Sequence, residues 1–456
     1  MRTIKIGNAQ GFWGDDIDAP ARLLAQQADL DYLTLDYLAE VTMSILARMR
    51  DRDPKLGYAR DFVDVVRACA PVLSKKRTTI VTNAGGLNPL ACAAAVQNAL
   101  KESGASGLEI SVVEGDDVLP IIRAELEKNP NTQRFAHLET KQPISAIANR
   151  IVTANAYIGA EPVIEALKNN PSVVVTGRVA DPSLTVAPCA HRFGWNLDEY
   201  NKLAGATIAG HLIECGTQCC GGISTDWLSL DRPEAIGFPV VEVNELGEVI
   251  VTKPANTGGR VDVRTVKEQL LYEIGDPDNY ISPDAIVSFL GLKVDEIGKD
   301  RVRVTGARGR PTTDSYKVTA TYRAGFRASS TLTIIGKDCV AKARRAGQVI
   351  YEKLKQNGNP PKHFKIECIG AGDAMPGVLP DLSKQLLETT LRVSAADEDK
   401  KIIERFAKEI VPLVTNGPQG TTGYFGGRPD VREIFGYWPC LVPRKELKLS
   451  VSTLTS

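Results

Sequence analysis

The first half of the chain alternates strand-like with helix-like segments, and this pattern constrains its fold more than any other feature. Short apolar segments with strand character recur, and each precedes a segment whose apolar residues have helical spacing. The strand-like segments, one of which runs into a Gly-rich turn, are 2–7, 31–36, 78–89, 107–113 and 171–177. Such alternation is typical of a mostly parallel sheet with helices on both faces. The sequence therefore predicts an α/β fold for this part of the chain.

The pattern changes after about residue 285. Residues 285–309 and 315–336 alternate apolar with polar side chains, which is typical of antiparallel strands joined by turns. Residues 339–358 have the spacing of an amphipathic helix. A chain of 456 residues is also too long for one ordinary core. We therefore predict two domains, an α/β domain over residues 1–285 and a smaller α+β domain over residues 286–456.

Composition excludes several classes of partner. Acidic and basic residues balance at 55 each, so net charge gives no reason to expect nucleic acid or an anionic membrane surface. No apolar run is long enough to span a bilayer, and the N-terminus lacks the apolar segment of a secretory signal. Nine scattered cysteines in a chain of this size fit reduced thiols, so we expect a cytoplasmic protein. Neither a G-x-G-x-x-G fingerprint nor a phosphate-binding P-loop is present, and no cofactor is expected.

Polar and glycine residues follow several of the predicted strands. In an open parallel sheet, ligands bind beyond the carboxyl ends of the strands, so these residues are expected to share one rim. The rim residues that we select for substrate binding are Asp15, Asp36, Asn83, Gly85, Gly86, Asn88 and Arg178. Backbone N–H groups between Asn83 and Asn88, at a predicted helix N-terminus, could hold a carboxylate or a phosphate. Arg178 could clamp a carboxylate, or it could form a structural ion pair with Asp181.

Residues 210–222, GHLIECGTQCCGG, combine a histidine, a glutamate and three cysteines. His211, Glu214 and Cys215 share one face of a helix predicted to end at Gly216, and all three residue types can bind zinc. No second cluster elsewhere completes a metal shell, so we predict no metal here. The simplest interpretation is a His–Glu contact beside a buried thiol. We favour a non-metal site in which Glu214 and His211 act as acid–base groups and the following turn supplies backbone donors.

Six ordered motifs, which together span nearly the whole chain, resemble the acyclic terpene utilisation A family. They are GFWGDD (11–16), DYLTLDYLAEVTMSIL (31–46), VTNAGGLNP (81–89), VTGRVADPSL (175–184), GHLIECGTQCCGG (210–222) and GRPDVREIFGYWP (427–439). The resemblance implies a cytosolic protein linked to the breakdown of branched terpenoid acids as acyl-CoA derivatives, in a hydratase or lyase role. It also implies that the Cys219–Cys220 pair departs from the family pattern, which leaves Glu214, Cys215 and Gln218 as candidates.

We therefore predict a hydro-lyase or carbon–carbon lyase that acts on a branched hydroxy acid or its acyl-CoA ester, and we expect a homo-oligomer. Proton abstraction beside a carbonyl needs a base, an acid and donors for the enolate oxygen. Glu214 or Asp181 could be the base and His211 the acid, with the Asn83–Gly86 turn as the donor group.

Two alternatives belong to other classes. One is a non-catalytic binding or scaffold subunit of an acyl-CoA-processing assembly, and the convergence of charged and Gly-rich motifs on one rim argues against it. The other is a hydrolase with a cysteine nucleophile. A helix C-terminus disfavours a thiolate, so the predicted position of Cys215 argues against this alternative.

Overall fold

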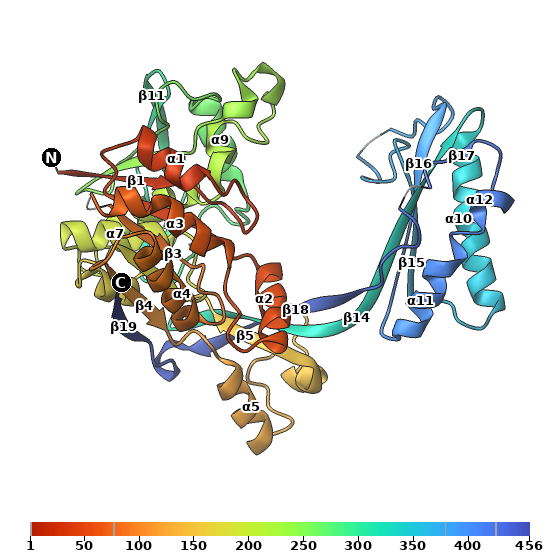
Figure 1. The fold of residues 1–456 in the computed structure, drawn as a ribbon, viewed down its shortest axis with the longest axis horizontal. Coiled ribbons are helices and arrows are strands. Elements are labelled where there is room, and N and C mark those ends of the chain that lie inside the picture. The colour runs from red at the N-terminus through yellow and green to blue at the C-terminus, as the bar shows by residue number, and fades with distance from the viewer. Residues whose placement is uncertain (1, 76–77, 379, 425) are drawn as a thin grey trace. The chain divides into compact units, whose positions relative to one another are not determined.

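The computed structural model describes residues 2–75, 78–378, 380–424 and 426–456, and its chain forms two compact units (Figure 1). The first unit holds the chain up to Thr321 together with Tyr437–Ser456, and the second holds Tyr322–Gly436. The division thus lies at Thr321 rather than at residue 285. The reason is that strands after residue 285, and the last strand of the chain, pair with strands of the first unit.

A parallel array forms the centre of the large sheet in the first unit. Its strands, in spatial order, are β1 (Thr3–Asn8), β2 (Tyr32–Leu35), β3 (Thr79–Thr82), β6 (Val173–Thr176) and β4 (Glu109–Glu114). Every residue of β2 and β6 is buried, as expected for strands that are covered on both faces. The parallel strands predicted from the alternating pattern are therefore present.

Antiparallel strands extend this array at both edges, so the whole sheet is mixed. Beside β1 lie, in order, β7 (Val240–Asn244), β8 (Val249–Thr252), β12 (Arg301–Thr305) and β11 (Lys293–Gly298). Beside β4 lies β19 (Ser450–Thr455), which returns the end of the chain to the first unit. The antiparallel strands predicted after residue 285 therefore exist, but some of them complete the first unit.

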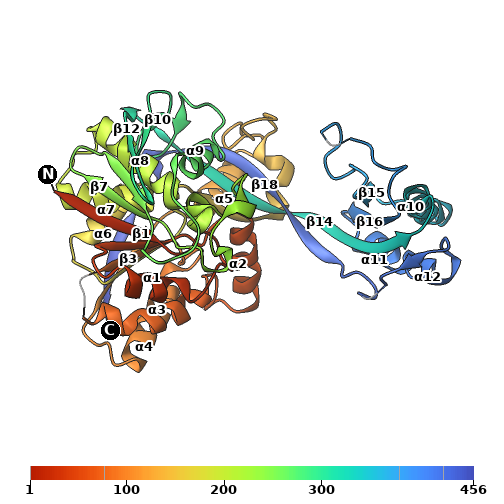
Figure 2. The same cartoon turned by 90° about the horizontal axis from the view of Figure 1, so that it is seen from above.

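Two groups of helices flank the large sheet (Figure 2). One group comprises α1 (Ala19–Gln26), α3 (Asp61–Leu73) and α4 (Pro89–Glu102), which pack on one another. The other comprises α6 (Glu161–Leu167), α7 (Ser183–Phe193) and α8 (Tyr200–Ile213). Strand β3 leads into the first group, whereas its neighbour β6 leads into the second. Such a reversal opens a crevice at the carboxyl ends of the two strands.

Further elements complete the first unit. Helices α2 (Glu40–Arg52), α5 (Leu119–Lys128) and α9 (Val263–Leu271) join strand β5 (Ile151–Ala156) and a 3-10 turn over Gly216–Cys220. A three-stranded sheet is formed by β13 (Arg308–Arg310), β10 (Ile286–Ser288) and β9 (Tyr280–Ile281). Among the described residues, no helix is both long and apolar enough to cross a membrane.

The second unit is a sheet with helices packed against one face. Its strands follow the order β15 (His363–Ile369), β16 (Glu388–Asp397), β14 (Ser315–Ile335) and β17 (Thr421–Thr422), and β18 (Arg432–Pro443) pairs with β14. The start of β14, up to Thr321, and the end of β18, from Tyr437, belong to the first unit. Helices α10 (Cys339–Gln356), α11 (Lys400–Glu409) and α12 (Leu413–Asn416) complete it. Its core includes Leu332, Leu391 and Val393 from the strands with Ile350 and Phe406 from the helices. The amphipathic helix predicted for residues 339–358 is α10.

Candidate functional site

A cavity of about 1030 Å³ lies in the first unit, where segments that follow β1, β2, β6 and α8 meet. Among the residues selected from the sequence, those that line it are Asp15, Asp36, Arg178, Asp181, Glu214, Cys215 and Gln218. These residues are spread over two hundred positions of the chain. These seven residues, which come from segments far apart in the sequence, therefore lie around one cavity.

Apolar side chains form much of the remaining wall of this cavity. They include Phe12, Leu38, Leu138, Ile223, Ile281 and Leu441. Phe12 is 57% exposed, Ile223 74% and Ile281 57%, so these three also face solvent, whereas Leu38 is buried. The cavity therefore combines a group of charged side chains with an apolar wall that reaches the molecular surface, which suits a ligand with one polar and one apolar part.

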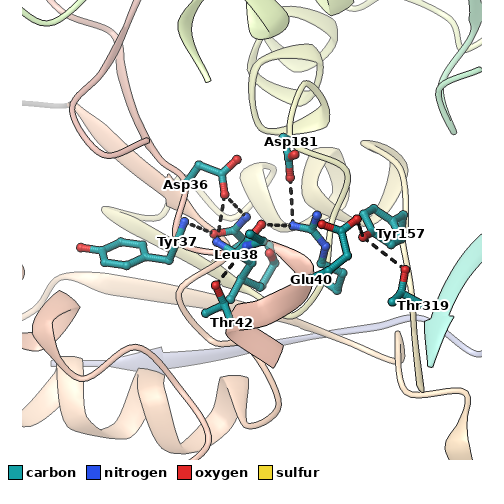
Figure 3. A network of polar contacts seen from close by, with 12 residues as sticks. Asp36, Tyr37, Leu38, Glu40, Thr42, Tyr157, Asp181 and Thr319 are labelled. Carbon is teal, nitrogen blue, oxygen red and sulfur yellow. Dashed lines mark hydrogen bonds and ion pairs between the residues drawn. The ribbon is translucent and has the colours of Figure 1, made fainter. Parts of the chain in front are cut away.

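The Arg178 side chain contacts three residues that are labelled in Figure 3, namely Leu38, Asp181 and Tyr157. Its Nη1 donates to the carbonyl oxygen of Leu38 at 2.6 Å and to Asp181 Oδ1 at 2.9 Å. Its guanidinium carbon lies 4.2 Å from the ring centroid of Tyr157, which is the geometry of a cation–π contact. The ion pair with Asp181 that the sequence left open is therefore present. The Nε atom of Arg178 is buried without a hydrogen-bond partner.

Two further groups fix the surroundings of Arg178. Asp116 Oδ2 accepts from the Arg178 backbone N–H at 2.9 Å and from Asn155 Nδ2 at 2.8 Å, and burial raises the pKa of Asp116 to about 6. The Tyr157 hydroxyl donates to Glu40 Oε1 at 2.7 Å. Burial alone would raise the pKa of Glu40, but this hydrogen bond and the charge of Arg178 outweigh burial and lower it. Contacts of both the backbone and the side chain of Arg178 thus fix the turn after β6.

Asp36 is a buried carboxyl at the end of β2. Its Oδ1 accepts from Asn83 Nδ2 at 2.7 Å and from the Leu38 backbone N–H at 3.1 Å. Burial and the nearby charge of Asp181 raise the pKa of Asp36 well above its ordinary value, although Arg178 and the Asn83 hydrogen bond oppose them. A cavity-lining carboxyl in such surroundings holds its proton more firmly than one in water, which suits a general acid.

Glu214, which lines the cavity, contacts His211, which lies behind it. His211 Nδ1 lies 3.1 Å from Glu214 Oε1, and His211 Nε2 lies 2.9 Å from the carbonyl oxygen of Gln269. The second oxygen of Glu214 is buried without a hydrogen-bond partner. Burial raises the pKa of Glu214, although His211 opposes it. Burial lowers the pKa of His211, but Glu214 outweighs this effect and the net shift is upward.

Cys215 follows Glu214 at the cavity wall. Burial and the charge of Glu214 raise the pKa of its thiol well above the ordinary range. All nine cysteines are unpaired, and burial raises the pKa of Cys219 to about 12. A nucleophilic cysteine needs the opposite shift, because the thiolate is the reactive form. The site therefore lacks the electrostatics of a cysteine hydrolase.

Five of the predicted residues do not line the cavity. Asn83 lies behind Asp36, and Asn88 caps α4 by accepting from the Ala91 N–H. Gly85 and Gly86 serve close packing, since a Cβ atom at Gly85 would lie 2.5 Å from the Thr176 carbonyl oxygen. Backbone N–H groups of this turn already bond to protein oxygens, for example that of Gly86 to Asn83 O at 3.1 Å. The geometry therefore does not support the prediction that this turn holds the enolate oxygen.

His211 is the fifth of these residues. It is buried behind Glu214 and touches Tyr280 and Phe289 on its other sides. His211 does not line the cavity, so its position does not support the predicted role as the acid. Its contact with Glu214 gives it a positioning role.

Sequence reasoning missed several side chains that line the cavity. Tyr157 follows β5, a strand that the pattern did not reveal. Lys317, whose Nζ lies 4.9 Å from the Tyr157 ring centroid, sits within β14. Glu273 follows α9 in a left-handed conformation with φ of 61°. The period-2 pattern around Lys317 indicated a strand, but nothing in it signalled that the strand passes a ligand cavity.

Within the described ranges, no group of three or more His, Cys, Asp or Glu side chains is arranged to hold a metal ion. His211 and Glu214 are engaged with each other, and burial and the charge of Glu214 raise the pKa of the Cys215 thiol. Besides its apolar wall, the cavity is lined by carboxyl groups, by Arg178 and Lys317, and by hydroxyl-bearing side chains such as Tyr157 and Tyr280.

Comparison with known proteins adds one result. No curated protein and no solved structure matches the chain. The model of one family, described as acyclic terpene utilisation family protein AtuA, matches residues 4–453. This match covers nearly the whole chain and includes all the residues that line the cavity. The chain therefore belongs to the acyclic terpene utilisation family.

Proposed function

We propose that this protein is a hydro-lyase or carbon–carbon lyase that acts on a branched, terpenoid-like hydroxy acid or its acyl-CoA ester. The observation that carries the proposal is the Glu214 carboxyl, which lines the cavity while its Oε1 contacts His211 at 3.1 Å. A buried carboxyl with a histidine behind it can exchange a proton with a ligand near neutral pH. Family membership supports the substrate class.

In the hydro-lyase form of the reaction, Glu214 takes a proton from the carbon beside the substrate carbonyl. The electron pair of that C–H bond forms the carbon–carbon double bond, and the C–O bond to the hydroxyl breaks. The leaving oxygen takes a proton from Asp36 and departs as water. Arg178 donates from its free N–H groups to the carbonyl oxygen, where negative charge develops.

The carbon–carbon lyase form uses the same groups. Glu214 then takes the proton of the hydroxyl, the C–O bond becomes a carbonyl as the adjacent carbon–carbon bond breaks, and Asp36 protonates the resulting enolate carbon. In both forms His211 acts behind Glu214 as a positioning residue. The Gln269 carbonyl requires a proton on His211 Nε2, so His211 can only hold or release the proton that it shares with Glu214.

The two alternatives differ in how well the cavity supports them. A cysteine hydrolase would need an ionised thiol, and the raised pKa of Cys215 opposes it. A non-catalytic binding subunit would keep the apolar wall but has no need of Glu214 paired with His211. We propose further that the protein works in the cytoplasm, where its nine cysteines would stay reduced, and as a homo-oligomer.

The experiment is an activity assay on hydroxyacyl-CoA esters that differ in branching. Formation of the unsaturated thioester, or of two shorter products, is followed for the unmodified protein, Glu214→Gln and the surface control Glu102→Gln. We expect Glu214→Gln to lose a factor of about 10²–10⁴ in kcat, the usual contribution of a general base. Glu102→Gln should be unchanged. Activity in Glu214→Gln equal to that of the control would refute the proposal.

A further inference from the structure

The charges around the cavity restrict what part of a ligand can enter it. Carboxyl side chains outnumber cationic side chains in the lining, where the cations are Arg178 and Lys317. Arg178 is already paired with Asp181, and Lys317 Nζ lies 3.9 Å from Glu40 Oε1. The cavity therefore has no cation that is free of a carboxylate partner within the part of the chain that the structure describes.

The excess of carboxyl groups over cations in the lining does not depend on Asp36 and Glu214, the two lining carboxyls whose pKa values are raised. If Asp36 and Glu214 are both counted as neutral, the remaining carboxyl residues of the lining are Asp15, Glu40, Asp181, Glu273 and Asp314. The charge of Glu273 reaches the site, because it contributes to raising the pKa of both Glu214 and Cys215. A negative group placed among these side chains is repelled by more charges than attract it.

Arg178 and the apolar side chains of the lining indicate which part of a ligand enters the cavity. Arg178, only 3% exposed, lines the cavity and has a buried Nε without a hydrogen-bond partner, so it can serve an uncharged oxygen atom. Phe12, Ile223 and Ile281 extend the apolar wall to the surface, where an alkyl chain can lie. Ile223 holds a left-handed conformation with φ of 48°, which is rare for a β-branched residue and marks a locally constrained rim.

We infer that this cavity binds the uncharged acyl portion of an ester or thioester, and that a free carboxylic acid is not its substrate. The inference rests on the proposed function and narrows it, because it selects the ester over the free acid. The polar acyl oxygen lies toward Arg178 and the alkyl chain follows the apolar wall. Any anionic carrier group, such as the phosphates of an acyl-CoA, stays outside the cavity.

The test is calorimetric binding of probes that share one saturated, branched ten-carbon skeleton and differ only at the head group. The probes are the carboxylic acid, its methyl ester and the corresponding alcohol, measured at pH 8 with the full chain. We expect the ester and the alcohol to bind about tenfold more tightly than the carboxylate, or better, because only the carboxylate is repelled by the lining. The affinity of the carboxylate should rise as the pH falls toward its own pKa.

A double variant, Glu273→Gln with Asp314→Asn, tests the electrostatic cause. It should raise the affinity for the carboxylate by a larger factor than that for the ester, whereas the matched surface variant Glu248→Gln should alter neither. A carboxylate that binds as tightly as the ester, or failure of all three probes to bind, would overturn the inference. These outcomes are separable from the proposed function, which fails only if Glu214→Gln stays active on the hydroxyacyl esters.

Discussion

The imidazole of His211 is held between Glu214 Oε1, 3.1 Å from Nδ1, and the Gln269 carbonyl oxygen, 2.9 Å from Nε2. A carbonyl oxygen only accepts hydrogen bonds, so Nε2 must carry a hydrogen. The contact between Nδ1 and Oε1 then needs one proton, which either atom can hold. The pair therefore exists as imidazolium with carboxylate or as imidazole with carboxylic acid, and it titrates as one unit.

This pair should make the protein less stable as pH rises. The net pKa shift of His211 is upward because Glu214 outweighs burial, and burial raises the pKa of Glu214, so the folded state binds their protons more tightly than the unfolded state does. The stabilisation is fully present below the ordinary pKa values, about 4.3 for Glu and about 6.5 for His, and is lost as pH rises through the raised ones. Urea unfolding of the unmodified protein and His211→Gln between about pH 5 and 9 measures it. The variant should show a shallower pH dependence, and equal slopes would contradict the assignment.

Arg178 should matter for stability as well as for substrate use. Arg178→Ala removes the bonds to Leu38 and Asp181 and the contact with Tyr157, and we expect a loss of about 3 kcal/mol in the free energy of unfolding. Arg178→Lys keeps the charge but lacks the planar fork, so it should also be destabilised, though less, and should lose about tenfold to a hundredfold in kcat/KM.

Asp181→Ala separates the two roles of Arg178. This variant leaves Arg178 buried without its ion-pair partner, so the melting temperature should fall. The Arg178 N–H groups that we propose to contact the substrate remain, so kcat/KM should change less than in Arg178→Lys. Thermal melts and steady-state kinetics on these variants provide both readouts. Normal kinetics in Arg178→Lys would remove Arg178 from the site.

Gly11 should tolerate no side chain. A Cβ atom at this position would lie 2.8 Å from the Cys215 carbonyl carbon and 2.9 Å from the Gly216 nitrogen, both of which belong to the backbone beside Glu214. Gly11→Ala must therefore displace that turn, and we expect about 1–3 kcal/mol of destabilisation together with lower activity. Gly275→Ala is the matched control, because a Cβ atom there meets nothing within 4 Å. Equal melting temperatures and activities for the two variants would contradict this close packing.

Cys215 should be dispensable for the chemistry. Because burial and Glu214 raise the pKa of its thiol, it should react slowly with iodoacetamide at pH 7.5. Cys215→Ser should retain activity within about threefold, whereas a nucleophilic cysteine would lose at least about 10³-fold. Mass spectrometry of the labelled protein and kinetics of the variant decide between these outcomes.

Local patterns in the sequence were enough to predict the central parallel strands and the rim at their ends. Asp15, Asp36 and Arg178 follow separate strands, and parallel strands bring their carboxyl ends to one edge. The pairing of the edge strands could not be predicted, since that of β19 with β4, for example, joins residues far apart in the chain. The predicted boundary at residue 285 differs from the division at Thr321 for the same reason. The sequences of β11 and β12 do not indicate which sheet these strands join.

The candidate site, too, could be predicted only in part from the sequence. The glycines at 85 and 86 have the pattern of an anion-binding turn, but the structure shows that they allow close approach of Thr176 and Leu46. Glu214 lines the cavity and His211 does not, because α9 and β9 pack against the His211 ring. Spacing on a helix places two side chains on one face without saying which of them meets the ligand.

The most direct test of the acid–base account is a crystal structure of Glu214→Gln with a bound branched hydroxyacyl ester. The acyl group should lie inside the cavity. The carbon or hydroxyl that loses the proton should lie about 3–3.5 Å from the side-chain amide of residue 214. The acyl oxygen should lie within hydrogen-bonding distance of Arg178. Density for the ester outside this cavity, or with its reacting atoms turned away from residue 214, would contradict it.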